Sequence, residues 1–134
     1  MMTFEIEGKP PAMADKFAQV EKGLRKLKSY GPHSFASLTH ENGSYIQVAG
    51  GGQTCVIEKR SADGTHLRAY LETPRVPFEG EQTLVFGGGR ITMQPNEILA
   101  IDGVIELFRV FFGKDDAPDW VHWRDMSAMF DNGA

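Results

Sequence analysis

The sequence predicts an α+β fold in which a mainly antiparallel β-meander sheet of five to six strands packs against two α-helices. Three observations predict it. Two segments carry apolar residues at helical spacing, the region between them alternates short apolar runs with glycine-rich turns, and Asn42-Gly43 is typical of a tight hairpin. The chain has 134 residues, the length of one domain, which we expect to span residues 1–134.

The first part of the chain is expected to hold a leader and a helix. Residues 1–12 are predicted to form a leader or an edge strand, because Phe4 and Ile6 alternate with acidic residues. Residues 13–30 are predicted to form a helix that Gly31-Pro32 ends. Its buried stripe is made of apolar side chains three and four residues apart: Phe17, Val20, Leu24 and Leu27.

The middle of the chain, residues 34–93, is predicted to form β-hairpins. Alternation along the expected strand 66–72 sets Arg68 and Tyr70 on one face of the sheet. Glu58 lies on the preceding strand, and we expect its carboxylate to pair across the strands with Arg68. The turns that join the strands contain glycine and lie at residues 41–43, 62–64 and 87–89.

A second helix and a closing strand are expected near the C-terminus. Residues 98–113 are predicted to form the helix, and residues 119–124 the final strand. Alternation in that strand sets Trp123 toward the core and Trp120 toward solvent. The apolar stripe of the helix consists of Ile101, Val104, Ile105, Phe108, Phe111 and Phe112.

Composition and charge argue against several classes of function. The net charge of -4 disfavours nucleic-acid binding, which usually needs a basic face. No apolar stretch approaches the roughly 18 to 20 residues of a membrane span, so no membrane partner is expected. One cysteine and no pattern of an export signal favour the cytoplasm. The acidic excess lies in residues 68–134, where it either keeps the protein soluble or suits a basic protein partner.

The chain shows no recognisable catalytic set, so we expect no enzyme activity, no cofactor and no metal. Cys55 lies in an apolar strand, where a thiol is expected to pack in the core. The glycine clusters 50–52 and 87–89 lack the lysine of a phosphate-binding loop. The histidines lack the spacing of a local metal pair; they are His33, His40, His66 and His122.

Several short segments, taken in order along the chain, resemble a known family. They are Ser44–Gly51, Val56–Arg60, His66–Arg68, Phe108–Gly113 and Pro118–Trp123. This order resembles the bacterial polymorphic-toxin immunity proteins of the family often linked to deaminase toxins. The resemblance covers roughly residues 35–125. It implies a small single domain that binds and neutralises a cognate toxin by occluding its active site, with nothing catalytic of its own.

The chain departs from the pattern of that family in two places. The linker between Gly113 and Pro118 is long, and Arg124 follows the final tryptophan where an acidic residue is more typical. If acidic residues at that position contact the toxin in the family, the surface that meets the partner differs in this protein.

The residues expected to contact a toxin are an exposed aromatic side chain and its acidic neighbours. Trp120 stands near Asp115, Asp116 and Asp119, and such a surface suits the basic substrate channel of a toxin that attacks nucleic acid. The alternative is that Trp120 covers a helix end. The second choice for the partner surface is the strand face that carries Tyr70 and Glu72. We expect a monomer or a weak homodimer.

Two other functions stay open at this point. The protein could be a small-molecule-binding domain or an enzyme, with a pocket between sheet and helices where His66, Tyr70 and His122 converge. A polar cavity with a strongly shifted pKa favours that function, and a space tightly filled by the phenylalanines of the second helix excludes it. The protein could also be a homodimeric module that pairs through an exposed sheet edge.

Overall fold

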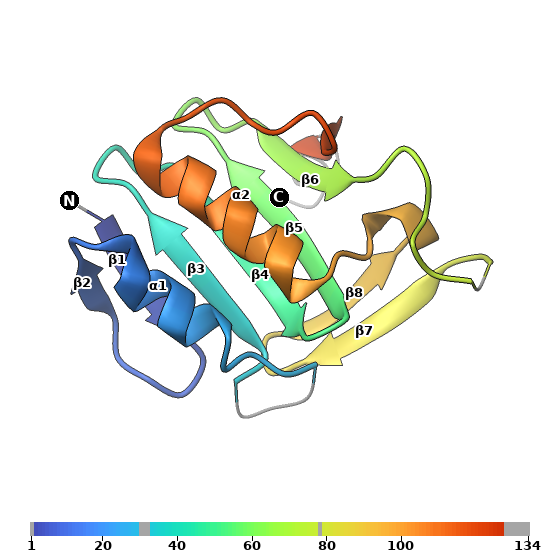
Figure 1. Cartoon of the computed structure of the whole chain (residues 1–134), viewed down its shortest axis with the longest axis horizontal. Helices are drawn as coiled ribbons and strands as arrows, with labels where there is room; N and C mark the ends of the chain where they lie inside the picture. Colours follow the sequence, from blue (N-terminus) through green and yellow to red (C-terminus); the bar gives the residue numbers. More distant parts are fainter. Residues whose placement is uncertain (1, 30–32, 78, 128–134) are drawn as a thin grey trace.

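The computed structural model describes residues 2–29, 33–77 and 79–127 and confirms the α+β fold. Over these residues a seven-stranded antiparallel sheet has the order β2-β1-β3-β4-β5-β6-β9 (Figure 1). The elements are β1 (Met2–Ile6), β2 (Ala12–Ala14), α1 (Phe17–Leu24), β3 (Phe35–Thr39), β4 (Tyr45–Gly51), β5 (Thr54–Arg60), β6 (His66–Tyr70), β7 (Gln82–Phe86), β8 (Gly89–Met93), the 3-10 helix η1 (Pro95–Glu97), α2 (Ile101–Gly113) and β9 (His122–Asp125).

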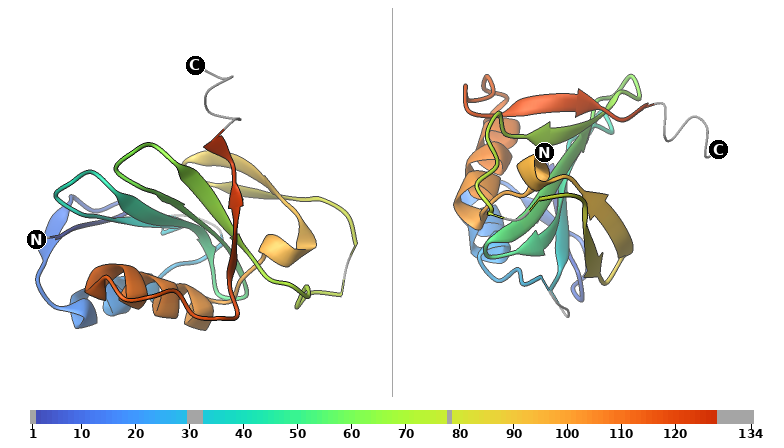
Figure 2. Two further views of the ribbon diagram at one scale, coloured as in Figure 1. Left: turned by 90° about the horizontal axis from the view of Figure 1, so that it is seen from above. Right: turned by 90° about the vertical axis from the view of Figure 1, so that its right-hand side faces the viewer.

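The main core lies between the large sheet and the two helices. Apolar side chains on one face of β3, β4 and β5 pack against Val20 and Leu24 of α1 and against Phe108 of α2. Both helices cover this one face of the sheet, and the pair β7–β8 lies on the other side (Figure 2). Burying one apolar face of a sheet under amphipathic helices is the main source of stability in such a fold. The layer of sheet residues in this core includes Ala36, Leu38, Ile46, Val48, Cys55, Ile57 and Ala69.

The first helix is shorter than the predicted span 13–30; residue 30 and the predicted stop at Gly31-Pro32 lie outside the described residues. It covers Phe17–Leu24, and Ala12–Ala14 instead form β2, which pairs with β1. The prediction failed at the N-terminal end because the backbone of Lys16 is extended and Met13 is exposed, so Met13 does not belong to the helical stripe. Strand β1 is therefore an interior strand, and β2 and β9 are the edge strands of the large sheet over the described residues.

Helix α2 and the closing strand are also shifted from their predicted ends. The helix begins at Ile101 rather than at residue 98, because Leu99 pairs with Cys55 in an extended backbone bridge. Its C-cap is Lys114, in the left-handed conformation with φ 58°. The final strand is His122–Asp125 rather than 119–124.

The third predicted hairpin is a sheet of its own. Strands β7 and β8 pair with each other only, over the described residues, and pack on the face of the large sheet that the helices leave uncovered. A second apolar cluster joins the two sheets, and it consists of Ala49, Val56, Leu84, Met93 and Ile98. The strands predicted as one mainly antiparallel meander of five to six strands therefore form two sheets, of seven and of two strands over the described residues.

Candidate functional site

A cluster of buried charges occupies the sheet face under β8 and η1. Arg68 donates through Nε to Glu58 Oε2 at 2.8 Å and through Nη1 to Glu97 Oε1 at 3.3 Å. His66 Nε2 lies 3.1 Å from Glu58 Oε1. All four of these side chains are buried. The predicted pairing of Glu58 with Arg68 is confirmed, since the two residues are direct neighbours in the register of β5 and β6.

Further hydrogen bonds give the members of this cluster partners on several elements. Gln47 donates to Glu58, and the backbone N–H of Gln94 donates to Glu97 at 2.8 Å. Arg68 also donates to the carbonyl of Thr92 at 2.8 Å. Buried ionic groups with such complete pairing are typical of a structural network. We interpret the cluster as the link that fixes β8 and η1 to the large sheet.

The three residues considered for a pocket do not line a cavity between sheet and helices. His66 belongs to the buried charge cluster, and Tyr70 faces His122 across β6 and β9 with ring centroids 5.3 Å apart. Tyr70 and His122 lie on the same side of the sheet as Arg68, because alternate residues share a face. This is the side opposite α2, so the alternative in which these three residues converge between sheet and helices is wrong.

A cavity between sheet and α2 does exist, with other residues around it. Its volume is about 410 Å³, and it opens between the C-terminal half of α2 and the ends of β3, β4, β5 and β6. Phe108 is fully buried in the core, but Phe111 only forms part of the cavity wall, so the helix does not fill this space. The lining residues include Ile46, Leu107 and Val110 with the polar side chains His40, Lys59, Arg60, Lys114 and Asp115.

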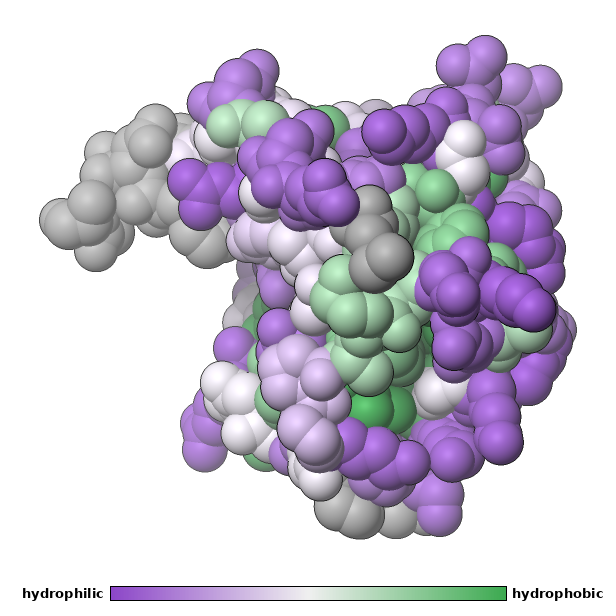
Figure 3. Space-filling view, turned by 90° about the vertical axis from the view of Figure 1, so that its left-hand side faces the viewer, coloured by the Kyte–Doolittle hydropathy of each residue, from purple (hydrophilic) through white to green (hydrophobic). Residues whose placement is uncertain are grey.

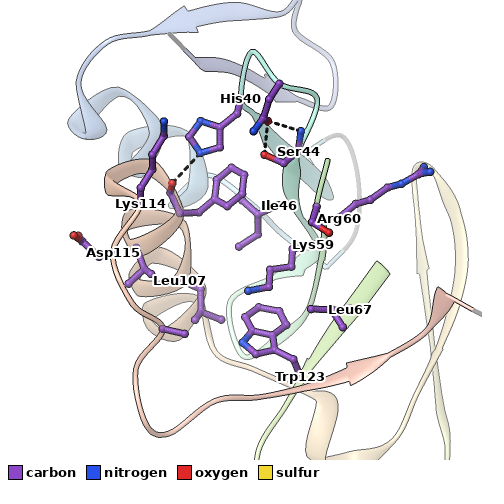
Figure 4. A pocket seen from close by; sticks show the side chains of 15 residues that line it. His40, Ser44, Ile46, Lys59, Arg60, Leu67, Leu107, Lys114, Asp115 and Trp123 are labelled. Carbon is purple, nitrogen blue, oxygen red and sulfur yellow. Dashed lines mark hydrogen bonds between the residues drawn. The ribbon is translucent and has the colours of Figure 1, made fainter. Parts of the chain in front are cut away.

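Lys59 is the notable polar residue of the cavity. Its side chain points inward, and Nζ lies 3.9 Å from the centroid of the Trp123 ring (Figure 4). Burial lowers the pKa of Lys59. The buried Nε1 of Trp123 has no hydrogen-bond partner among the described residues. Lys59 was not among the residues predicted for a site, although alternation with Cys55 and Ile57 puts it on the helix-facing side of β5.

Trp120 precedes β9 and packs on the outside of α2, and 37% of it is exposed, so its predicted exposure is confirmed although strand alternation does not produce it. Its indole N–H donates to Glu106, and a Cβ on Gly103 would stand 3.2 Å from its ring. The tryptophan therefore both covers the helix and leaves part of its ring in solvent. Two carboxylates next to these residues in sequence are exposed: Asp102 precedes Gly103 on α2, and Asp119 precedes Trp120.

The predicted partner residues fall on two different surfaces. Asp115, Asp116 and Asp119 are exposed in the segment 114–121, which returns along α2 from its C-terminal end to Trp120. We call this segment, 114–121, the acidic surface; on α2 itself Arg109 is exposed, and Asp102 lies 3.5 Å from Arg25. Tyr70 lies on the other side of the sheet and is half-buried, with the guanidinium of Arg124 4.7 Å from its ring centroid. Glu72, which follows β6, is exposed.

The end of the molecule that carries β1, β2 and α1 has an apolar area among charged residues (Figure 3). Met13 is exposed there, and the rings of Phe17 and Phe112 meet edge to face at 5.8 Å. These rings partly close the core between the two helices.

Comparisons with protein-family models, curated proteins and solved structures find no match to this chain. Within residues 2–29, 33–77 and 79–127, no helix is long and apolar enough to cross a membrane. In the same part of the chain, no group of three or more histidine, cysteine or acidic side chains is placed to hold a metal ion.

Proposed function

We propose that this protein is a bacterial immunity protein that binds a cognate toxin domain and neutralises it by covering its active site. The observation that carries this proposal is the partly exposed Trp120, which a hydrogen bond to Glu106 fixes on a surface rich in carboxylates. A fixed aromatic ring loses little conformational entropy when it enters a pocket of a partner, and such residues dominate the energy of many interfaces.

The charge on the acidic surface gives the proposed interaction its specificity. Asp115, Asp116 and Asp119 are exposed beside Trp120 in sequence, and no basic residue other than Lys114 occurs in the segment 114–121. A toxin that acts on nucleic acid has a basic substrate channel, and carboxylates placed there occupy the positions of phosphates. Attraction between the two surfaces speeds association, and burial of Trp120 slows dissociation.

The function assigns no catalytic role to any residue of this chain. The buried charge cluster has partners throughout, and the burial of Cys55 raises the pKa of its thiol to about 12, which keeps it protonated and unreactive. The protein acts in the cytoplasm of the cell that makes the toxin, where the toxin would otherwise reach its substrate.

Co-expression with the toxin tests the proposal. The toxin is sought as the C-terminal domain of a large secreted protein encoded by the neighbouring reading frame. Cells that make the toxin should survive when they also make this protein, and Trp120→Ala should abolish that protection. Met13→Ala is the matched control, since Met13 is also a large exposed apolar residue but lies far along the chain on β2. Death of cells that hold both wild-type proteins contradicts the proposal.

A further inference from the structure

The cavity beside α2 contains two nitrogen donors that lack an oxygen acceptor among the described residues. Lys59 contacts the face of the Trp123 ring, and Trp123 Nε1 is buried without a hydrogen bond. A buried donor that is left without an acceptor destabilises the folded state. Both nitrogens point toward α2, on the side of Leu107 (Figure 4). The arrangement is therefore one that an acceptor from outside the chain would complete.

The rest of the wall shows which kind of acceptor suits the cavity. Around Lys59 the wall is apolar, formed by Ile46 of β4 together with Leu107, Val110 and Phe111 of α2. Asp115 is the one carboxylate among the described lining residues, and its side chain points away from Lys59 (Figure 4). The half-buried Lys59 therefore has no carboxylate partner among the described residues, and an anionic group gains more beside it in this partly apolar space than it would in water.

We propose that this cavity binds a small amphipathic carboxylate, whose carboxylate group pairs with Lys59 and Trp123 and whose apolar chain lies along α2. Lys59 Nζ moves from the ring of Trp123 onto one carboxylate oxygen, and the indole N–H donates to the same group. Because Trp123 Nε1 is buried and Lys59 Nζ lies 3.9 Å from the ring centroid, the lysine side chain must move off the ring for one carboxylate to reach both donors. A volume of about 410 Å³ accommodates a short-chain ligand of this kind.

This inference goes beyond toxin binding and does not depend on it. The proposed ligand site centres on Lys59 and Trp123, whereas the proposed toxin contact centres on Trp120 and the exposed aspartates. Loss of one activity without the other is therefore measurable, and the two proposals fail separately.

Calorimetric titration of the purified chain with octanoate tests the inference, with octanol as the uncharged comparison. We expect octanoate to bind at least about tenfold more tightly than octanol, since a charge-assisted hydrogen bond in an apolar site is worth at least that factor. Lys59→Met, which keeps an apolar stem, should remove this preference, and Lys22→Met on the exposed face of α1 should leave it unchanged. Absence of octanoate binding, or equal affinity of the wild type for octanoate and octanol, overturns the proposal.

An NMR titration of the wild type keeps the inference testable if a variant does not fold. The chain has two tryptophans, and the indole N–H of Trp120 already donates to Glu106. Octanoate should shift the indole N–H resonance of Trp123, which gains an acceptor, and leave that of Trp120 in place. Equal shifts of both resonances, or no shift of Trp123, contradict the proposed binding mode.

Discussion

Arg68 and Arg124 stand directly opposite each other on the adjacent strands β6 and β9, and the carboxylate of Glu97 accepts a hydrogen bond from each. Like charges at directly opposed positions destabilise a sheet. Glu97 offsets this repulsion from a third element, the 3-10 helix η1, and only 2% of it is exposed. The carboxylate of Glu97 therefore links η1 to both β6 and β9, and so holds the layer that contains β8 against the large sheet.

Glu97→Gln should lower the free energy of unfolding by about 3 kcal/mol, because it leaves Arg68 buried with less compensation and facing Arg124. Chemical denaturation followed by tryptophan fluorescence measures this loss. Glu79→Gln removes the same charge from an exposed residue and should change stability by less than about 0.5 kcal/mol. Equal stability of the two variants contradicts the role assigned to Glu97.

Gly51→Ala should destabilise the fold by more than about 3 kcal/mol. A Cβ at this position would lie 2.3 Å from the backbone carbonyl carbon of Leu27, and backbone cannot move aside as a flexible side chain can. Thermal melting compares it with Gly43→Ala. Gly43 has φ +92° and open space around it, so that variant isolates backbone strain of about 1–2 kcal/mol. Similar melting temperatures for the two variants would show that the chain after α1 does not pass so close to β4.

The thiol of Cys55 should resist modification in the folded protein and make stability fall at high pH. Burial raises its pKa to about 12, so the folded protein keeps the proton that the unfolded chain releases above about pH 9. The corresponding stability is present below pH 9 and is lost as the pH rises toward 12. Denaturation from pH 8 to about pH 10.5 should show a steeper decline for the wild type than for Cys55→Ala.

A thiol-specific reagent gives the independent measurement at neutral pH. Because the chain has one cysteine, every labelled molecule reports Cys55. Labelling should be slow under native conditions and rise with denaturant in parallel with unfolding. Fast labelling of the native protein contradicts the burial of this side chain.

Charge reversal on the acidic surface should slow toxin association under the proposed function. The pair of changes Asp115→Lys and Asp116→Lys removes attraction to a basic partner, so the association rate at low salt should fall about tenfold and depend less on salt. Stopped-flow mixing with a catalytically inactive toxin measures the rate. Glu5→Lys with Glu79→Lys changes the net charge equally at two other exposed positions. If both double variants associate at the same rate, net charge rather than this surface governs the encounter.

The periodicity of the sequence was sufficient for the class of fold and for the faces of its strands. Helical spacing located both helices, and Asn42-Gly43 located the turn between β3 and β4, where Gly43 has φ 92°. Alternation put Glu58 and Arg68 on one face, and the buried ion pair follows from it. These features depend on residues close together in the chain, so local geometry determines them.

Only the tertiary structure decided which segments of the chain pack against each face of the large sheet. Alternation sets Lys59 toward the helices, but its contact with Trp123 requires β6 and β9 to follow β5 in the sheet. Glu97 joins Arg68 only because β7–β8 fold back over the large sheet, which brings η1 onto the same face. Burial of apolar area favours such layers without specifying their order, so contacts between distant segments do not follow from local pattern.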